Sequence, residues 1–393
     1  MLKEEKMKTI KIKIALILSF CIFISTNTFA DLTNVEYFDG IEPQKHINSA
    51  YSQEMKNSLS GTAISTDNVE DLIHVFNPEV LNNWNNWESN KSSQDIYNDY
   101  LDAADNLYSA AGGQDSAVQE GMLYAQADAM RIQADKNADD SYTKFLTYYL
   151  AEKKLVKDTK IMIYEYKKSE SDILSAKESY NEAVRKEQSA KNALNYGSGT
   201  QVEYLTAKKN TLDAKSSIVK AESSNKTHKR NIIINCGKSM NDNVSIEDPD
   251  LSLDLDASTI NIDNDYQKAL SKNIQYEIYK RKKDNAITEE VKKEYQILID
   301  AAPQKIYNDL ETKYSAIIDV IDTYSNYIIA LDLANDNFLK AKNEYANGNI
   351  SLKEYKTAEY NVNISKCNID AAKCSLKIAI ENYKSVIEGL TDC

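Results

Sequence analysis

The sequence predicts an all-α protein made of two tandem repeats of long antiparallel helical hairpins, with little or no β structure. Glycine and proline together make up 14 of 393 residues, whereas they are about 12% of an average chain. Apolar residues recur at helical spacing over most of the chain. The second half also repeats the first at an offset of 151 residues.

The first thirty residues have the pattern of a secretory signal peptide cleaved before Asp31. Five lysines precede the apolar run Ile14–Ile24, and the small-residue exit Thr28-Phe-Ala30 follows it. An uncleaved membrane anchor is the alternative, but the run is short for a bilayer span. Cleavage would leave 42 basic and 58 acidic residues, a net charge of −16. Nucleic acid is therefore excluded as a partner, because its phosphates would be repelled.

The first repeat is expected at residues 67–237, after a polar, extended N-terminal arm at 31–66. Breaks are expected at 111–114 and 137–140, although the second could be only a polar patch within a helix. The run from Ser141 to about Tyr196 contains no glycine or proline. It therefore predicts one long helix, and a second helix runs back from about Gln201 to the end of the repeat.

The second repeat is expected at residues 266–390, after an extended linker at 238–265 in which apolar and polar residues alternate. Its helical pattern meets Pro303, which marks a kink or a new helix start. The pattern then continues to Tyr345 and, after a turn, to about Leu390.

Glycines mark the two hairpin tips, near residues 197 and 348. Gly197 and Gly199 lie in the first turn, and Gly348 lies in the second. At the offset of 151, Gly197 aligns with Gly348, and a Glu-Tyr-x-Thr-Ala block begins six residues after each. This shared block indicates duplication of a helix–turn–helix hairpin.

The predicted helices carry two parallel seams of seven-residue period. Before the first turn the seam residues are Ala176, Ala183 and Ala190, and after it the pairs are Leu205-x-Ala207, Leu212-x-Ala214 and Val219-x-Ala221. Two seams favour a ring in which each helix touches two neighbours. A simple antiparallel coiled coil is the alternative, although it makes poor use of the second seam.

No constellation of residues indicates catalysis, so we expect no enzyme, cofactor or metal. His46, His74 and His228 have no metal-ligand spacing, and no glycine-rich phosphate loop follows a strand. Cysteines are too sparse for a disulfide scaffold. Cys367 and Cys374 are interpreted as small core residues, with a reactive or bridging pair as the alternative.

Residues 66–390 resemble the TolC-type outer-membrane efflux family. The Asn77-Pro-Glu element is similar to the start of a family repeat, and residues 265–274 match that start more loosely, without the proline. The segments at 197–207 and 348–358 are similar to the family's hairpin-tip motif, Gly-x-x-Ser/Thr-x-x-acidic.

The resemblance implies a homotrimer whose hairpins form a twelve-helix tunnel. The tips would close its entrance and dock onto an adaptor protein bound to a membrane transporter. By position, Glu203 and Glu354 lie where family members have acidic residues at the aperture. Three copies of a carboxylate around an opening would attract cations. Alternatively, each glutamate only favours the dipole of the helix whose first turn it occupies.

The sequence departs from the family pattern because it lacks the membrane β-barrel strands expected in each repeat. Residues 125–140 and 280–290, where such strands would lie, are polar and helix-like. We expect an exported, TolC-like efflux duct of the cell envelope, in the outer membrane by family or at the surface if the organism has one membrane. The alternative is an exported structural or interaction coiled-coil protein without transport activity.

Overall fold

The computed structural model describes residues 37–48, 53–61, 63–89, 93–114, 116–137, 139–240, 244–252 and 260–391. The chain divides into two units, residues 1–40 and 41–393. The 3-10 turn η1 (Phe38–Gly40) lies in the first unit, and helices α2 to α13 belong to the second. The predicted signal peptide, residues 1–30, lies outside the described residues.

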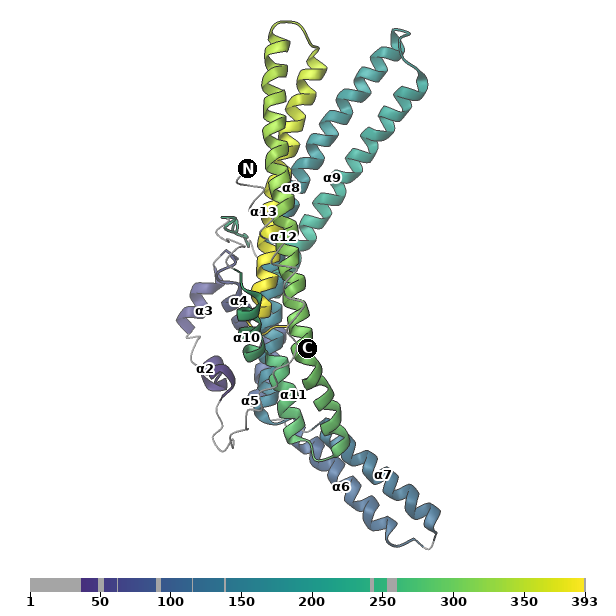
Figure 1. Ribbon diagram of the computed structural model, residues 1–393, viewed down its shortest axis with the longest axis vertical. Helices are drawn as coiled ribbons and strands as arrows, with labels where there is room; N and C mark the ends of the chain where they lie inside the picture. Colours follow the sequence, from purple (N-terminus) through teal and green to yellow (C-terminus); the bar gives the residue numbers. More distant parts are fainter. Residues whose placement is uncertain are drawn as a thin grey trace, which may run out of the picture. The chain divides into compact units, whose positions relative to one another are not determined.

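Two long helical hairpins dominate the second unit (Figure 1). Helices α8 (Ser141–Asn195) and α9 (Gln201–Asn235) form the first, and α12 (Glu289–Ala346) and α13 (Leu352–Ile387) form the second. The β pairing in the described ranges is one isolated parallel bridge, between Ile64 and Ile246. The predicted all-α fold with two tandem hairpins is therefore confirmed.

The four long helices are ordered α9–α8–α13–α12. Helix α8 packs against both α9 and α13, and α13 packs against both α8 and α12. Helices α8 and α13 therefore lie inside this layer, whereas α9 and α12 are its edges. This order decides which of the predicted seams pack against another long helix of the same chain.

Short helices pack against the ends of the long ones that lie far from the bends. In the first repeat they are α4 (Val69–Phe76) and α5 (Pro78–Glu88), and in the second they are α10 (Ile262–Lys272) and α11 (Ile274–Asn285). The core of the second repeat lies where α10 meets α12 and α13, around residues that are almost fully buried: Ala269, Ile306, Leu310, Leu376 and Ile380. Burial of such apolar side chains stabilises the fold by about 1.5–3 kcal/mol for each large residue.

A left-handed glycine ends the last helix of each repeat. Gly237 follows α9 with φ of 65°, and Gly389 follows α13 with φ of 81°. A Cβ at Gly237 would lie 2.0 Å from the carbonyl oxygen of Phe76, and one at Gly389 would lie 1.9 Å from that of Lys272. Only glycine permits this approach of backbone to backbone.

An asparagine at the start of a short helix also bonds to the chain beside each of these glycines. Asn77 accepts two backbone N–H bonds that start α5, and its amide donates to the carbonyl oxygen of Asn235 at 2.8 Å. Asn273 accepts the N–H of Tyr276 at the start of α11, and its amide donates to Thr391 O at 3.2 Å. We call each pair of contacts a joint: Asn77 and Gly237 in repeat 1, and Asn273 and Gly389 in repeat 2. Both repeats contain the joint, although Asn273 is not followed by a proline as Asn77 is.

Between the short and the long helices the two repeats differ. The first contains a helical hairpin, α6 (Ser93–Ala111) and α7 (Ala117–Lys136), and the second contains only the turn at residues 286–288. The side chain of Asp135 accepts the backbone N–H groups of Ile287 and Thr288 at 2.9 and 2.6 Å. Asp135 of repeat 1 thereby fixes the turn that precedes α12 in repeat 2. The breaks expected at 111–114 and 137–140 are confirmed.

Three sequence-based expectations are corrected. The arm at 31–66 is not wholly extended, because α2 (Pro43–Asn48) and α3 (Gln53–Ser60) are helical. Such short helices show too few turns for periodicity to reveal them. The linker ends earlier than residue 265, since Asn261 caps α10 and helix begins at Ile262.

Of the two alternatives for Pro303, a kink or a new helix start, the second is wrong, because α12 continues through the proline. A proline inside a helix removes one hydrogen bond and costs about 3 kcal/mol. Its neighbours Ala302 and Ile306 are fully buried in the core of the second repeat. Their packing holds the helix together across the proline.

The described cysteines are free thiols. Cys236 and Cys374 are buried, and Cys367 is half-buried. Burial raises the pKa of Cys236 to about 12 and that of Cys374 to about 11. The interpretation as a core residue is confirmed for Cys374, whereas Cys367 is only half-buried; Cys393 lies outside the described residues.

Substituting the joint glycines tests the repeated backbone contact. Gly237→Ala and Gly389→Ala should each lower the free energy of unfolding by about 2–5 kcal/mol, because left-handed strain adds to overpacking. Gly197→Ala is the matched control: its φ of 70° is similar, but a Cβ there would meet nothing within 4 Å. It should lose only about 1–2 kcal/mol. Urea unfolding followed by circular dichroism measures the losses, and equal losses in all three would contradict the contact.

Candidate functional site at the hairpin bends

Each long hairpin reverses direction on a glycine with positive φ, 70° at Gly197 and 73° at Gly348. In both bends this glycine N–H donates to the carbonyl three residues earlier, and the next N–H donates to the carbonyl five residues before it. This is the bonding pattern of a helix C-cap with a left-handed residue. The two bends are thus copies of one another, as the aligned glycines predict, and both are exposed (Figure 1).

Gly199 belongs to the first bend alone. A Cβ at this position would lie 2.9 Å from the Cβ of Ala193, so glycine permits the turn to fold back on the end of α8. At the offset of 151 the second bend has Ile350 instead. Gly197 and Gly348 are therefore the shared requirement of the motif.

Glu203 and Glu354 close capping boxes at the starts of α9 and α13. The N–H of Glu203 donates to the Thr200 hydroxyl at 3.2 Å, and the Glu203 carboxylate accepts the Thr200 N–H at 2.7 Å. Ser351 and Glu354 make the same two bonds at 3.2 and 2.8 Å. These backbone and hydroxyl bonds lower the pKa of both exposed carboxyls. Both glutamates therefore stabilise a helix start, the local role that the sequence left open.

Apolar side chains surround the bends. Tyr196 at the first bend is 86% exposed, and Val202, Tyr345 and Leu352 are exposed as well. A bend that only connected two helices would not require them. The bends therefore combine carboxylates with apolar surface that another protein could cover.

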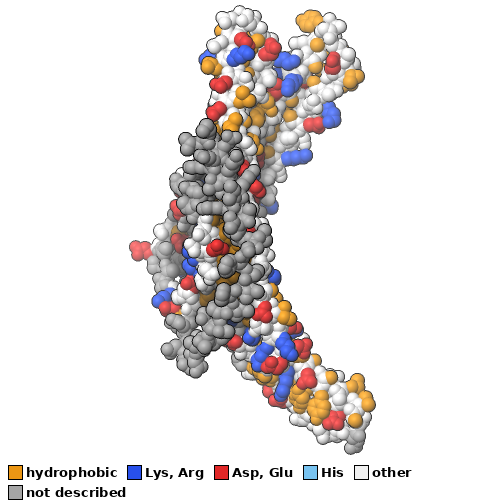
Figure 2. All heavy atoms as spheres, viewed as in Figure 1, with side chains coloured by type: hydrophobic (Ala, Val, Ile, Leu, Met, Phe, Trp, Pro, Cys, Tyr) orange, Lys and Arg blue, Asp and Glu red, His pale blue; other side chains and the backbone are white. Residues whose placement is uncertain are grey.

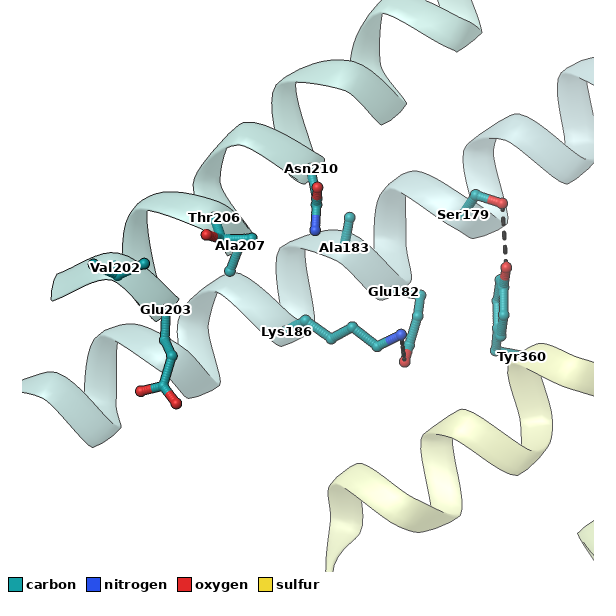
Figure 3. A pocket seen from close by; sticks show the side chains of 10 residues that line it. All are labelled: Ser179, Glu182, Ala183, Lys186, Val202, Glu203, Thr206, Ala207, Asn210 and Tyr360. Carbon is teal, nitrogen blue, oxygen red and sulfur yellow. Dashed lines mark hydrogen bonds and ion pairs between the residues drawn. The ribbon is translucent and has the colours of Figure 1, made fainter. Parts of the chain in front are cut away.

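An open groove of about 440 Å³ lies between α8, α9 and α13 beside the first bend (Figure 3). Its buried charge is Glu182, which pairs with Arg185 at 2.7 Å and accepts a bond from the Thr357 hydroxyl at 3.1 Å. Nearby, the hydroxyls of Ser179 and Tyr360 lie 3.3 Å apart. The Glu182–Thr357 and Ser179–Tyr360 contacts join the first hairpin to the second. The Ser179 hydroxyl faces another hydroxyl and not a general base.

The two seams of α9 have different surroundings. The small residues Ala207, Ala214 and Ala221 are half-buried, on the helix whose long neighbour is α8. The large residues Leu205, Leu212 and Val219 are 51%, 59% and 61% exposed. The alanine seam is thus partly covered within the chain, whereas the seam of large apolar residues is exposed.

The opposite edge, α12, also exposes large apolar residues. They are Ile328, Ile329, Leu333 and Leu339. Hydrophobic side chains are visible on the surface of both long hairpins (Figure 2).

The interior helices carry polar residues at the positions equivalent to these exposed ones. At the offset of 151, the α9 seam corresponds to Lys356, Asn363 and Asp370 on α13. The four α12 residues correspond to Lys177, Glu178, Glu182 and Gln188 on α8. At these positions each edge helix is apolar where its interior copy is polar.

The structure also joins residues that sequence spacing did not group. His46 and His74 both contact the buried carboxylate of Glu152, whereas His228 lies elsewhere, on α9. One signal was available, because Glu152 lies on the same apolar stripe of α8 as Phe145 and Val156. A carboxylate on such a stripe needs partners.

A pH titration tests the capping boxes. Replacing Ser351 by Ala should raise the pKa of Glu354 toward its ordinary value of 4.5, because the hydroxyl bond is lost. Since the native pKa is lowered, the bond stabilises the fold above pH 4.5 and the effect is lost as the pH falls through the native value. Carbon NMR of labelled glutamate measures both residues, and Glu203 in the same variant is the control. An unchanged Glu354 would contradict the assignment.

No protein-family model matches the chain and no curated protein matches it, but solved structures do. A membrane protein from Pseudomonas aeruginosa aligns with a TM-score of 0.55 and 10% identity, over 84% of this chain and 92% of its own. The outer-membrane channel OprN aligns with a TM-score of 0.54 and 9% identity, over 82% and 90%. The Campylobacter jejuni outer membrane channel CmeC aligns with a TM-score of 0.51 and 13% identity, over 95% and 94%.

At such low identity the likeness establishes the fold and not the activity. The described helices include none that is long and apolar enough to span a bilayer. Repeats, bends and solved structures agree: the chain has the fold of the TolC-type outer-membrane efflux channels.

Proposed function

We propose that this chain is the subunit of an exported, TolC-like efflux duct of the cell envelope, in which three copies form a twelve-helix ring. The observation that carries the proposal is the apolar surface of α9 and α12 at positions where the interior helices are polar. The two edges are different surfaces, so contact between neighbouring copies is head-to-tail. Head-to-tail contacts produce a ring when the rotation closes.

The spacing of the exposed residues from the bends supports this contact. Leu212 lies fifteen residues after Gly197, and Leu333 lies fifteen residues before Gly348. Leu205 and Leu339 lie eight and nine residues from the same glycines. When the bends of neighbouring copies are level, apolar residues of α9 therefore face apolar residues of α12.

The bends would form the entrance of the duct. Glu203 and Glu354 would contribute six carboxylates from three copies, and exposed glutamates are charged at neutral pH. Such a ring favours cations. The exposed Tyr196, Val202 and Leu352 would dock onto an adaptor protein, which in turn binds a membrane transporter.

Transport is favoured over catalysis by the neighbours in fold, CmeC and OprN, which are outer-membrane channels. No cofactor is part of the proposal. The competing function is a structural spacer in the envelope, for which a monomer or dimer would suffice.

Light scattering during size-exclusion chromatography tests the ring. The chain lacking residues 1–30 should be a trimer, and Leu212→Glu or Leu333→Glu should shift it to monomer, since each buries a charge in the contact. Met122→Glu is the control, because Met122 is exposed on α7, a helix that belongs to neither long hairpin. A monomeric or dimeric parent chain would overturn the duct and favour the spacer.

Cysteine cross-linking tests which edges meet. Leu212→Cys combined with Leu333→Cys should give disulfide-linked oligomers up to the trimer under oxidation, whereas either single variant should not. Leu212→Cys with Ile297→Cys is the control, because Ile297 is exposed on the same helix but 51 residues from Gly348. If both pairs cross-linked equally, the bends of neighbouring copies would not lie at the same level, which would contradict the proposed contact.

A further inference from the structure

Three donors from separate elements converge on one buried carboxylate, that of Glu152 on α8. His74 Nδ1, from α4, lies 2.7 Å from Oε1, and His46 Nε2, from α2, lies 3.4 Å from Oε2. Trp84 Nε1, from α5, donates to Oε2 at 2.8 Å. Only 2% of the Glu152 side chain is exposed, and 7% and 19% of those of His74 and His46.

The spacing of these atoms matches the coordination shell of a small metal ion. The two ring nitrogens and the carboxylate oxygen all lie within 4.8 Å of one another. Tetrahedral zinc, with bonds of about 2.0–2.2 Å, holds its ligand atoms about 3.3 Å apart. The two measured separations run to different carboxylate oxygens: 2.7 Å from His74 Nδ1 to Oε1, which is a hydrogen-bond length, and 3.4 Å from His46 Nε2 to Oε2. Small rotations of the imidazoles would complete the geometry.

The electrostatics of the cluster also suit a cation. The Glu152 carboxylate is buried, and the nitrogens of His46, His74 and Trp84 all lie against its two oxygens. The ammonium of Lys153, the next residue on α8, pairs with Glu70. The side-chain contacts of the Glu152 carboxylate that the described residues provide are those with His46, His74 and Trp84.

The surroundings resemble an outer coordination shell. The indole N–H of Trp84 fixes the orientation of the carboxylate, as outer-shell donors do for metal ligands. The rings of Trp84, Phe145 and Tyr149 lie 5.1, 6.0 and 4.9 Å from the His46 ring, centroid to centroid. An apolar wall of this kind limits access of water to a bound ion.

We propose that His46, His74 and Glu152 form a binding site for a divalent transition-metal ion, zinc in the first instance. Two imidazoles and one carboxylate are a donor set that zinc prefers, and they leave a fourth position open. The ion would clamp α2 to α4 and α8, whose ligands His74 and Glu152 lie 28 and 106 residues after His46 in the sequence. A bound ion would stabilise the fold by closing the loops between these elements, with a water molecule in its fourth position. The site does not depend on the duct, since all three ligands belong to one chain.

Metal titration of the chelator-treated chain lacking residues 1–30 tests the site. Zn²⁺ alone, followed by calorimetry, should bind at one equivalent, and Co²⁺ alone should give the visible absorption bands of a four-coordinate ion. Zinc should also raise the Tm of this chain. Absence of stoichiometric binding would overturn the proposal.

Variants locate the ligands. His46→Ala, His74→Ala and Glu152→Gln should each weaken zinc binding at least a hundredfold, and Trp84→Phe should weaken it about 10- to 100-fold through the outer shell. His228→Ala is the control, because this histidine lies on α9 beside Glu165, away from the cluster. His46→Ala is decisive if the buried variants fail to fold, because α2 is peripheral and its histidine is partly exposed. Unchanged affinity in folded His46→Ala would exclude the site.

Discussion

Side-by-side packing of long helices with a seven-residue period is the constraint on which the rest of this structure depends. A helix can keep the same face against a neighbour over many turns only if its seam repeats at that period. Helices α8 and α13 each have two long neighbours within one chain, whereas α9 and α12 have one. The arrangement thus leaves two apolar edges, and the proposed ring satisfies both without adding a helix.

Each of the four long helices ends in the same way, at a glycine with positive φ. Left-handed glycines end α8, α9, α12 and α13, at Gly197, Gly237, Gly348 and Gly389. At the bends the glycine faces open space, so only its φ matters. At the opposite ends the glycine also touches backbone across the joint. The chain therefore reverses direction at the bends, whereas at the opposite ends backbone contact fixes the long helices to the short ones.

Duplication produced two copies, but their positions in the layer made them diverge. Glu182 on the interior helix α8 corresponds to Leu333 on the edge helix α12. The glutamate is buried between the hairpins and bonded to Thr357, whereas the leucine is exposed. Between the joints and the long helices the first copy carries the α6–α7 hairpin and the second a short turn that Asp135 of the first copy caps. The copies are thus equivalent in backbone and specialised in their surfaces.

The sequence by itself determined the helical class, the duplication and the bends, because periodicity, glycine placement and capping pairs are local and act within a few turns. Glu203 and Glu354 could be placed in first turns, since the Thr200 and Ser351 partners stand three residues earlier. Tertiary structure alone decided which seam is buried, that α12 continues through Pro303, and that Glu152 collects His46 and His74. These outcomes depend on which elements meet across large sequence separations, and that is a property of packing that no local pattern contains.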